Sequence, residues 1–145
     1  YKHGLYVDAG DVDDDGVDEI VTGIGDVAKP RVRVFEADST LIQSYFVLSE
    51  NNRDGIRVSV GNYSDFYVGD EVAIVPANGS HPRVKLYTGT GSYIKDSYDS
   101  WPHWIEDWWR GDYDIAIAET DGFTNGHVWG AAFENRRPTV RTAVY

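Results

Sequence analysis

Apolar and polar residues alternate along several short segments of the chain. In residues 55–60, three apolar side chains share one face of an extended strand, while Arg57 and Ser59 fall on the other. Residues 31–34 alternate arginine with valine in the same way. A period of two is typical of a β-strand with one buried and one wetter face. Because no stretch of ten or more residues holds a clean helical period, the pattern predicts an all-β protein.

The same order of strand-like segments occurs three times. An acidic residue followed by apolar residues marks each copy, in residues 18–21, 70–73 and 113–116. A second matching segment follows each of these, in residues 30–35, 82–87 and, faintly, 126–129. Closing strands are expected at residues 41–48, 92–98 and 139–145. With an opening strand before each copy, every unit is predicted to be a four-stranded antiparallel meander of roughly 45–50 residues, the size of a β-propeller blade.

The repeats predict one domain over residues 1–145, made of three tandem blade-like sheets that form part of a propeller or a repeat array. The approximate blades are residues 1–50, 51–100 and 101–145. Sheets packed in a row leave both outer faces uncovered. We expect exposed apolar residues there, Ile20 or Val21 in the first copy and Val140 or Val144 in the third. The predicted partners are therefore other copies of the chain or flanking repeats, in a fibre, array or ring, of which the fibre or array is favoured.

The nine residues from Asp11 to Glu19 include six carboxylates. Like charges ~4 Å apart repel by roughly 1 kcal/mol in water and by more at lower dielectric, which favours a bound cation over a bare acidic turn. The aspartates stand at alternate positions, as in calcium loops, and Gly16 follows where the chain must turn sharply. A helix-loop-helix calcium hand would instead place its closing glutamate at Thr22. The predicted Ca²⁺ ligands are Asp11, Asp13, Asp15, the carbonyl of Val17, and Glu19.

Residues 10–23 and 30–35 resemble the FG-GAP/VCBS type of β-propeller repeat found in integrin α-subunits and in many secreted microbial proteins. The resemblance covers most of the first two copies and is weak in the third. It implies that the loop between the first two strands of a blade binds calcium through the ligands named above, although Glu19 departs from the aspartate common in the integrin form. The loops at residues 61–71 and 106–114 are predicted to keep the turn and to have lost the metal.

Composition narrows the possible functions. The net charge of −11 argues against nucleic acid and anionic membranes, and no apolar run approaches the ~20 residues that span a bilayer. There is no cysteine. No nucleophile elbow, phosphate loop or dinucleotide fingerprint appears, and the dense acid cluster is better explained by calcium than by glycoside hydrolysis. We therefore predict that the chain is not an enzyme.

Two further features bear on partners. The tryptophans Trp101, Trp104, Trp108 and Trp109 form either a stacking platform for glycans or an apolar interface, and the interface is favoured. Asn62 and Asn78 begin N-glycosylation sequons, as in a glycoprotein.

The sequence thus predicts a secreted, non-enzymatic calcium-binding β-repeat module with a structural or cell-adhesion role, within a larger fibre, array or ring. Millimolar extracellular calcium favours a location outside the cell. The alternatives are a carbohydrate-binding, lectin-like propeller and a fragment of a polysaccharide-degrading enzyme.

Overall fold

The computed structural model describes residues 4–49, 51–77, 84–96, 112–118, 127–134 and 137–142. Throughout these residues the regular elements are strands, and no helix is long and apolar enough to cross a membrane. The chain is all-β there, as predicted. The four tryptophans of the predicted platform and the sequon at Asn78 lie outside the described residues.

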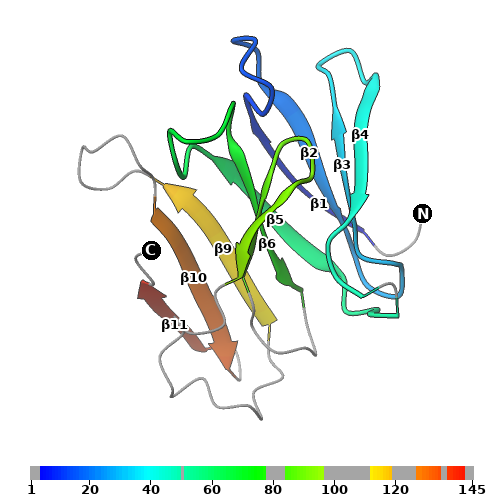
Figure 1. The fold of residues 1–145 in the computed structure, drawn as a ribbon. Coiled ribbons are helices and arrows are strands. Elements are labelled where there is room, and N and C mark those ends of the chain that lie inside the picture. Colours follow the sequence, from blue (N-terminus) through cyan, green and yellow to red (C-terminus); the bar gives the residue numbers. More distant parts are fainter. Residues whose placement is uncertain are drawn as a thin grey trace.

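The first sheet consists of four consecutive antiparallel strands, shown in blue to cyan in Figure 1. They are β1 (Leu5–Gly10), β2 (Glu19–Ile24), β3 (Arg31–Phe35) and β4 (Leu41–Phe46). Alternation is clearest in β2, whose odd-numbered residues are buried while Ile20 is exposed. The sheet is the four-stranded meander that the alternation predicted.

The second sheet repeats this order. Its strands are β5 (Ile56–Gly61), β6 (Glu71–Pro76), β7 (Lys85–Thr88) and β8 (Tyr93–Asp96). They pair antiparallel in chain order, like β1 to β4. Every residue of β6 is buried because this sheet is covered on both faces.

The two sheets pack face to face over a core of branched apolar side chains. Its fully buried members are Val21, Val32, Val34, Ile56, Val72 and Ile74. Burying a side chain of this size contributes roughly 1.5–3 kcal/mol. The face of the second sheet that points away from the first packs on Ile115 of the next strand. In the first copy, Ile20 therefore belongs to the outer face and Val21 to the core, which decides between the two alternatives stated above.

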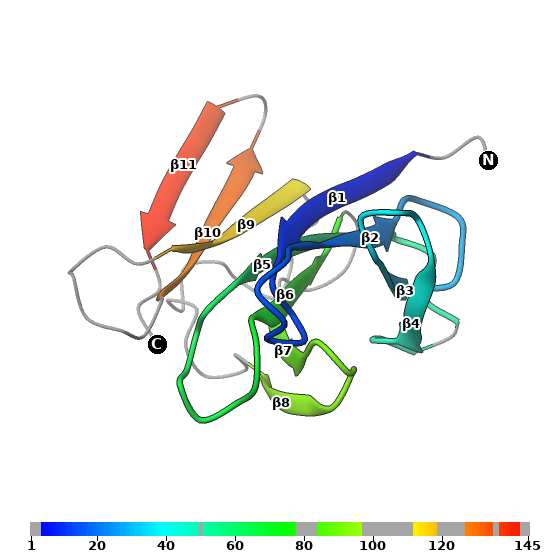
Figure 2. The same cartoon turned by 90° about the horizontal axis from the view of Figure 1, so that it is seen from above.

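The strand β9 (Asp112–Ala118) continues the row. Figure 2 shows β1, β5 and β9 side by side near the middle of the molecule, with the remaining strands extending outward. In the backbone, β9 pairs antiparallel with β10 (His127–Glu134), which pairs with β11 (Arg137–Thr142). The side chain of Val140 is not described, and Val144 lies outside the described residues.

The position of β9 corrects the predicted alignment of the third copy. Residues 113–116 were matched to the second strand of each blade, but β9 contacts β5 and β6 as β5 contacts β1 and β2. The N–H of Ile117 donates to Ser59 Oγ at 3.0 Å, and the N–H of Val60 donates to Asp8 Oδ2 at 2.8 Å. Thus Ile117 corresponds to Val60, and β9 is a first strand.

The pairing register gives the same result. Ala118 at the end of β9 faces His127, as Gly10 faces Glu19 and Gly61 faces Glu71. The third counterpart of the acidic loop is consequently the segment between β9 and β10, residues 119–126, and not the predicted 106–114. Residues 106–111 and 119–126 lie outside the described residues, whereas 112–114 belong to β9. The short match of Asp114-Ile115 to the acid-apolar pairs of the other copies gives the wrong alignment. The position of a strand in the row depends on its contacts with residues distant in sequence, which a short local match does not contain.

Candidate cation site in the loop between β1 and β2

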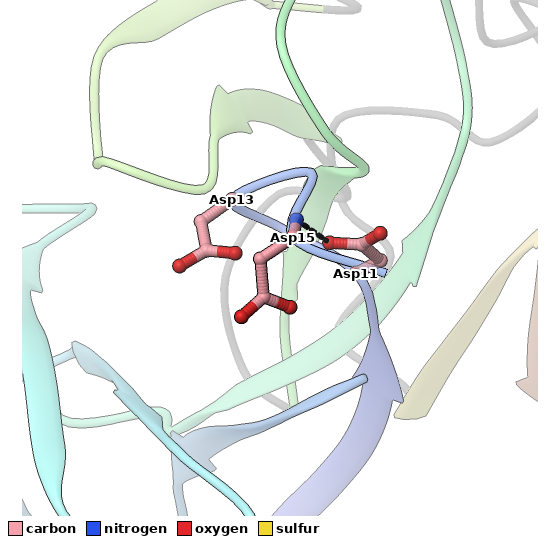
Figure 3. A group of neighbouring side chains, drawn as sticks. All are labelled: Asp11, Asp13 and Asp15. Atoms are coloured by element: carbon pink, nitrogen blue, oxygen red, sulfur yellow. Dashed lines mark hydrogen bonds between the residues drawn. The ribbon is translucent and has the colours of Figure 1, made fainter. Parts of the chain in front are cut away.

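Three aspartates of the loop from β1 to β2 converge. Asp11, Asp13 and Asp15 each offer a carboxylate oxygen, and these atoms lie within 4.8 Å of one another. Asp11 is half-buried and the other two are exposed. Figure 3 shows the three side chains grouped at the loop. Oxygen ligands at this proximity suit a hard cation such as Ca²⁺.

Backbone N–H groups hold two of these carboxylates in place. Asp11 accepts from Asp15 at 3.1 Å and from Gly16 at 2.9 Å, and Asp15 accepts from Val17 at 2.8 Å. The turn requires left-handed backbone at Asp14, with φ 65°, and at Gly16, with φ 88°. Aspartate and glycine tolerate that region better than most residues. Because an ionised carboxylate has about four acceptor positions, both aspartates retain lone pairs for a cation.

Glu19, the predicted closing ligand, stands at the first position of β2 and is fully buried. Its Oε2 accepts from the N–H of Val12 at 2.9 Å, whereas no group of the described residues bonds Oε1. Burial raises the pKa of this carboxyl, and the Val12 bond opposes the rise. Neighbouring negative charges raise it further: those of Asp13, Glu36 and Asp15. Among the described residues the group of mutually close acids contains the three aspartates and not Glu19.

The carbonyl of Val17 stays a predicted ligand. The Val17 side chain is exposed, and its N–H is the group that fixes Asp15. Its place two residues after the last aspartate leaves it close to the cluster along the chain.

The second sheet anchors the loop through Val12, a contact that sequence analysis missed. Val12 is buried, and a Cβ added at Gly69 or Gly89 would lie 2.5 or 2.3 Å from its backbone. The N–H of Asp70 donates to the carbonyl of Asp11 at 2.7 Å. A lone valine amid acids and two glycines in later turns were the only sequence signals. The anchor means that the start of the acidic loop, at Asp11 and Val12, is held against the second sheet, whereas residues 13–18 are exposed.

The loop from β5 to β6 has the same framework but lacks a group of three close carboxylates. Glu71 is fully buried, and its Oε2 accepts from the N–H groups of Tyr63 at 2.7 Å and Ser64 at 3.3 Å. Its Oε1 has no hydrogen-bond partner within the described part of the chain, as at Glu19. Among the described residues the close group of acids occurs only in the first loop. Asn62 of the first sequon is exposed here, and its Nδ2 donates to Asp65 at 3.4 Å.

Comparisons with protein-family models, with curated proteins and with solved structures found no match.

Proposed function

We propose that the chain is a calcium-binding β-repeat module of the FG-GAP/VCBS type, with a structural or adhesive role outside the cell. In this proposal the three sheets are propeller-blade units within a larger fibre, array or ring. The module performs no catalysis. The observation that supports the proposal most is the convergence of three aspartate carboxylates in a loop whose backbone is fixed before any ion binds.

The arrangement suits Ca²⁺ for two physical reasons. Ca²⁺ takes six to eight oxygen ligands in flexible geometry, and the carboxylates of Asp11, Asp13 and Asp15 supply the first of these from one short segment. Val12 and Glu19 hold the base of the loop by a hydrogen bond of 2.9 Å, so little loop entropy remains to be lost on binding. Pre-organisation of this kind strengthens binding. Glu19, the Val17 carbonyl and water complete the coordination in the proposed site.

Charge and location support the same proposal. With a net charge of −11, the chain gains from partial neutralisation by a divalent ion. A single exposed loop suits the millimolar calcium outside cells. The sequon at exposed Asn62 agrees with that location.

Thermal unfolding with and without calcium tests the proposal. A ligand that binds only the folded chain stabilises it by about 2.7 kcal/mol at a concentration of 100 Kd, so chelation is expected to lower Tm by several degrees. Asp13→Asn should remove most of this response. Asp65→Asn, an equally exposed acid of the second loop, is the matched control and should leave it intact. Calorimetry without heat of calcium binding, together with an unchanged Tm after chelation, would refute the site.

A further inference from the structure

The outward face of the first sheet carries exposed apolar side chains. Leu5 is 59% exposed, Val7 65%, Ile20 36% and Leu41 51%. Strand register brings three of these positions onto neighbouring strands, since Leu5 faces Ile24, Val7 faces Thr22 and Ala9 faces Ile20. This face is therefore a continuous patch across β1 and β2.

The same positions of the second sheet form its contact with the first sheet. The strands β1 and β5 have equal length, end in glycine, and pair with the next strand in the same register. The counterparts of Leu5, Val7, Ala9 and Ile20 are therefore Ile56, Val58, Val60 and Val72. All four are buried in the core between the sheets. The exposed patch thus has the positions and the apolar character of a face that another sheet covers.

A steric rule operates where neighbouring first strands meet. A Cβ added at Gly10 would lie 2.5 Å from Val60 Cγ1, and one added at Gly61 would lie 3.0 Å from Ile117 Cγ2. At each contact, glycine at the end of one strand makes room for a branched side chain on the next. A larger residue at the glycine position requires a smaller residue opposite.

A contact between β9 and the β1 of another copy would be the third of this kind, and its residues meet the size requirement. Ala118 of β9 corresponds to Gly10 and Gly61, and it is exposed. Ala9 of β1 corresponds to Val60 and Ile117 and is also exposed. The added methyl of Ala118 is matched by the smaller side chain of Ala9. The free face of β9 therefore fits the outward face of β1 better than it fits a sheet with valine or isoleucine at this place.

Hydrogen bonding shows the same match. Asp8 and Ser59 each accept an N–H from the following first strand, at Val60 and Ile117. Ala116 holds the corresponding place on β9 and has no side-chain acceptor. The N–H that would need it belongs to Ala9, and that group already donates to Asp8 Oδ1 of its own strand at 3.0 Å. At the contact of β9 with β1, neither Ala116 nor Ala9 therefore needs the hydrogen bond that joins β1 to β5 and β5 to β9.

We propose that the outward face of the β1–β4 sheet binds the free face of β9 in a second copy of the chain, head to tail, with Ala9 against Ala118. The proposal deepens the assembly part of the proposed function and does not depend on calcium. A contact between two different faces of one molecule either closes a ring or extends a filament.

Sedimentation of Ala9→Arg and Ala118→Arg variants tests this contact. The wild-type chain is expected to form species heavier than a monomer at micromolar concentration. Each variant should associate about 100-fold more weakly or worse, because an arginine would be buried without a partner. Val68→Arg is the control: Val68 is 71% exposed in the loop from β5 to β6, and this change should leave association unaltered.

Mixing Ala9→Arg with Ala118→Arg provides the decisive measurement. Ala9→Arg retains an intact β9 face, and Ala118→Arg retains an intact β1 face, so the mixture should form one-to-one dimers that do not extend. A monomeric wild type, association that survives both arginines, or loss of association with Val68→Arg would each overturn the proposal. Calcium is held constant throughout, and each variant's Tm response to chelation is recorded. Failure of the head-to-tail contact can therefore be told from failure of the cation site.

Discussion

The loops at residues 11–18 and 62–70 occupy the same place in successive sheets and share one framework. In each, a glutamate at the start of the following strand is fully buried and accepts backbone N–H groups of the loop. In each, the second oxygen of that glutamate has no hydrogen-bond partner among the residues that the structure describes. Only the first loop brings acids together; the second carries Phe66, which is 94% exposed. The comparison separates the buried glutamate, which both loops share, from the three close aspartates, which only the first loop has.

Gly16 of the first loop and Gly69 of the second differ in how closely other atoms surround them, and the glycine of the acid-poor loop is the more tightly packed. Gly16 has φ 88°, and a Cβ added there would meet nothing within 4 Å, whereas Gly69 has φ 70° and lies against the Val12 backbone. The glycine of the acid-rich loop is thus only a turn residue. The glycine of the plain loop is part of the contact between sheets.

The largest expected effect is that of Gly69→Ala. Its Cβ would lie 2.5 Å from the Val12 carbonyl carbon, and backbone atoms on both sides cannot yield as a side-chain end could. We expect a loss of about 3 kcal/mol or more, from steric overlap added to left-handed strain. Gly16→Ala, the matched control, should cost only about 1 kcal/mol. Denaturant unfolding measures both, and equal losses would show that the sheet contact at Gly69 contributes nothing.

A smaller effect is expected from removing the buried glutamates. Glu71→Ala leaves two backbone N–H groups, those of Tyr63 and Ser64, without their acceptor, whereas Glu19→Ala leaves only that of Val12. An unpaired donor costs about 1–3 kcal/mol when buried and less when partly buried, as those of Tyr63 and Ser64 are. Glu71→Ala, which removes two bonds, should therefore destabilise the calcium-free chain by about 2 kcal/mol and by more than Glu19→Ala. Urea titrations in chelator compare the two. The reverse order would mean that Glu19 does more in the folded chain than hold Val12.

The smallest expected effect is a change in pH dependence. Burial raises the pKa of Glu71 above its ordinary value of 4.5, the Tyr63 and Ser64 bonds oppose the rise, and the charge of Asp70 adds to it. The folded chain therefore holds a proton that the unfolded chain has already lost just above pH 4.5, and stability falls as pH rises through the folded-state pKa. Glu71→Gln should reduce this fall.

Melting curves recorded at several pH values in chelator, for wild type and Glu71→Gln, give the difference directly. Acids that do not interact with Glu71 titrate alike in both proteins and cancel in the comparison. An identical pH slope in the two proteins would contradict the raised pKa.

Much of the fold followed from the sequence because its causes are local. Alternation in residues 31–34 and 55–60 predicted β3 and β5, and the acid spacing predicted that Asp11, Asp13 and Asp15 would lie together. The place of β9 could not be predicted in the same way, since it depends on Ser59 and Gly61, more than fifty residues earlier in the chain. The blade-like nature of the sheets and the bound ion stay predictions.

The role of Glu19 illustrates the same limit at the site. Its position in the loop motif predicted a ligand, and nothing local indicated the bond to Val12. No role was predicted for Glu71, because its loop lacks the alternating acids that mark the first loop. The framework that both loops share is not visible in those acids. A buried glutamate at the start of each second strand is the signal that a repeat alignment could have used.

The contact between the second sheet and Val12 also bears on the order in which parts of the proposed site form during folding. The aspartates of the first loop all precede residue 20, yet Gly69, Asp70 and Gly89 of the second sheet contact the backbone at Asp11 and Val12. Contacts so distant in sequence form late because long loops must close first. During synthesis, a chain that has emerged only as far as residue 50 carries the carboxylates without the sheet that clamps their loop. The bonds within residues 11–19 can form first, and docking of the second sheet then adds a further restraint on the start of the proposed site.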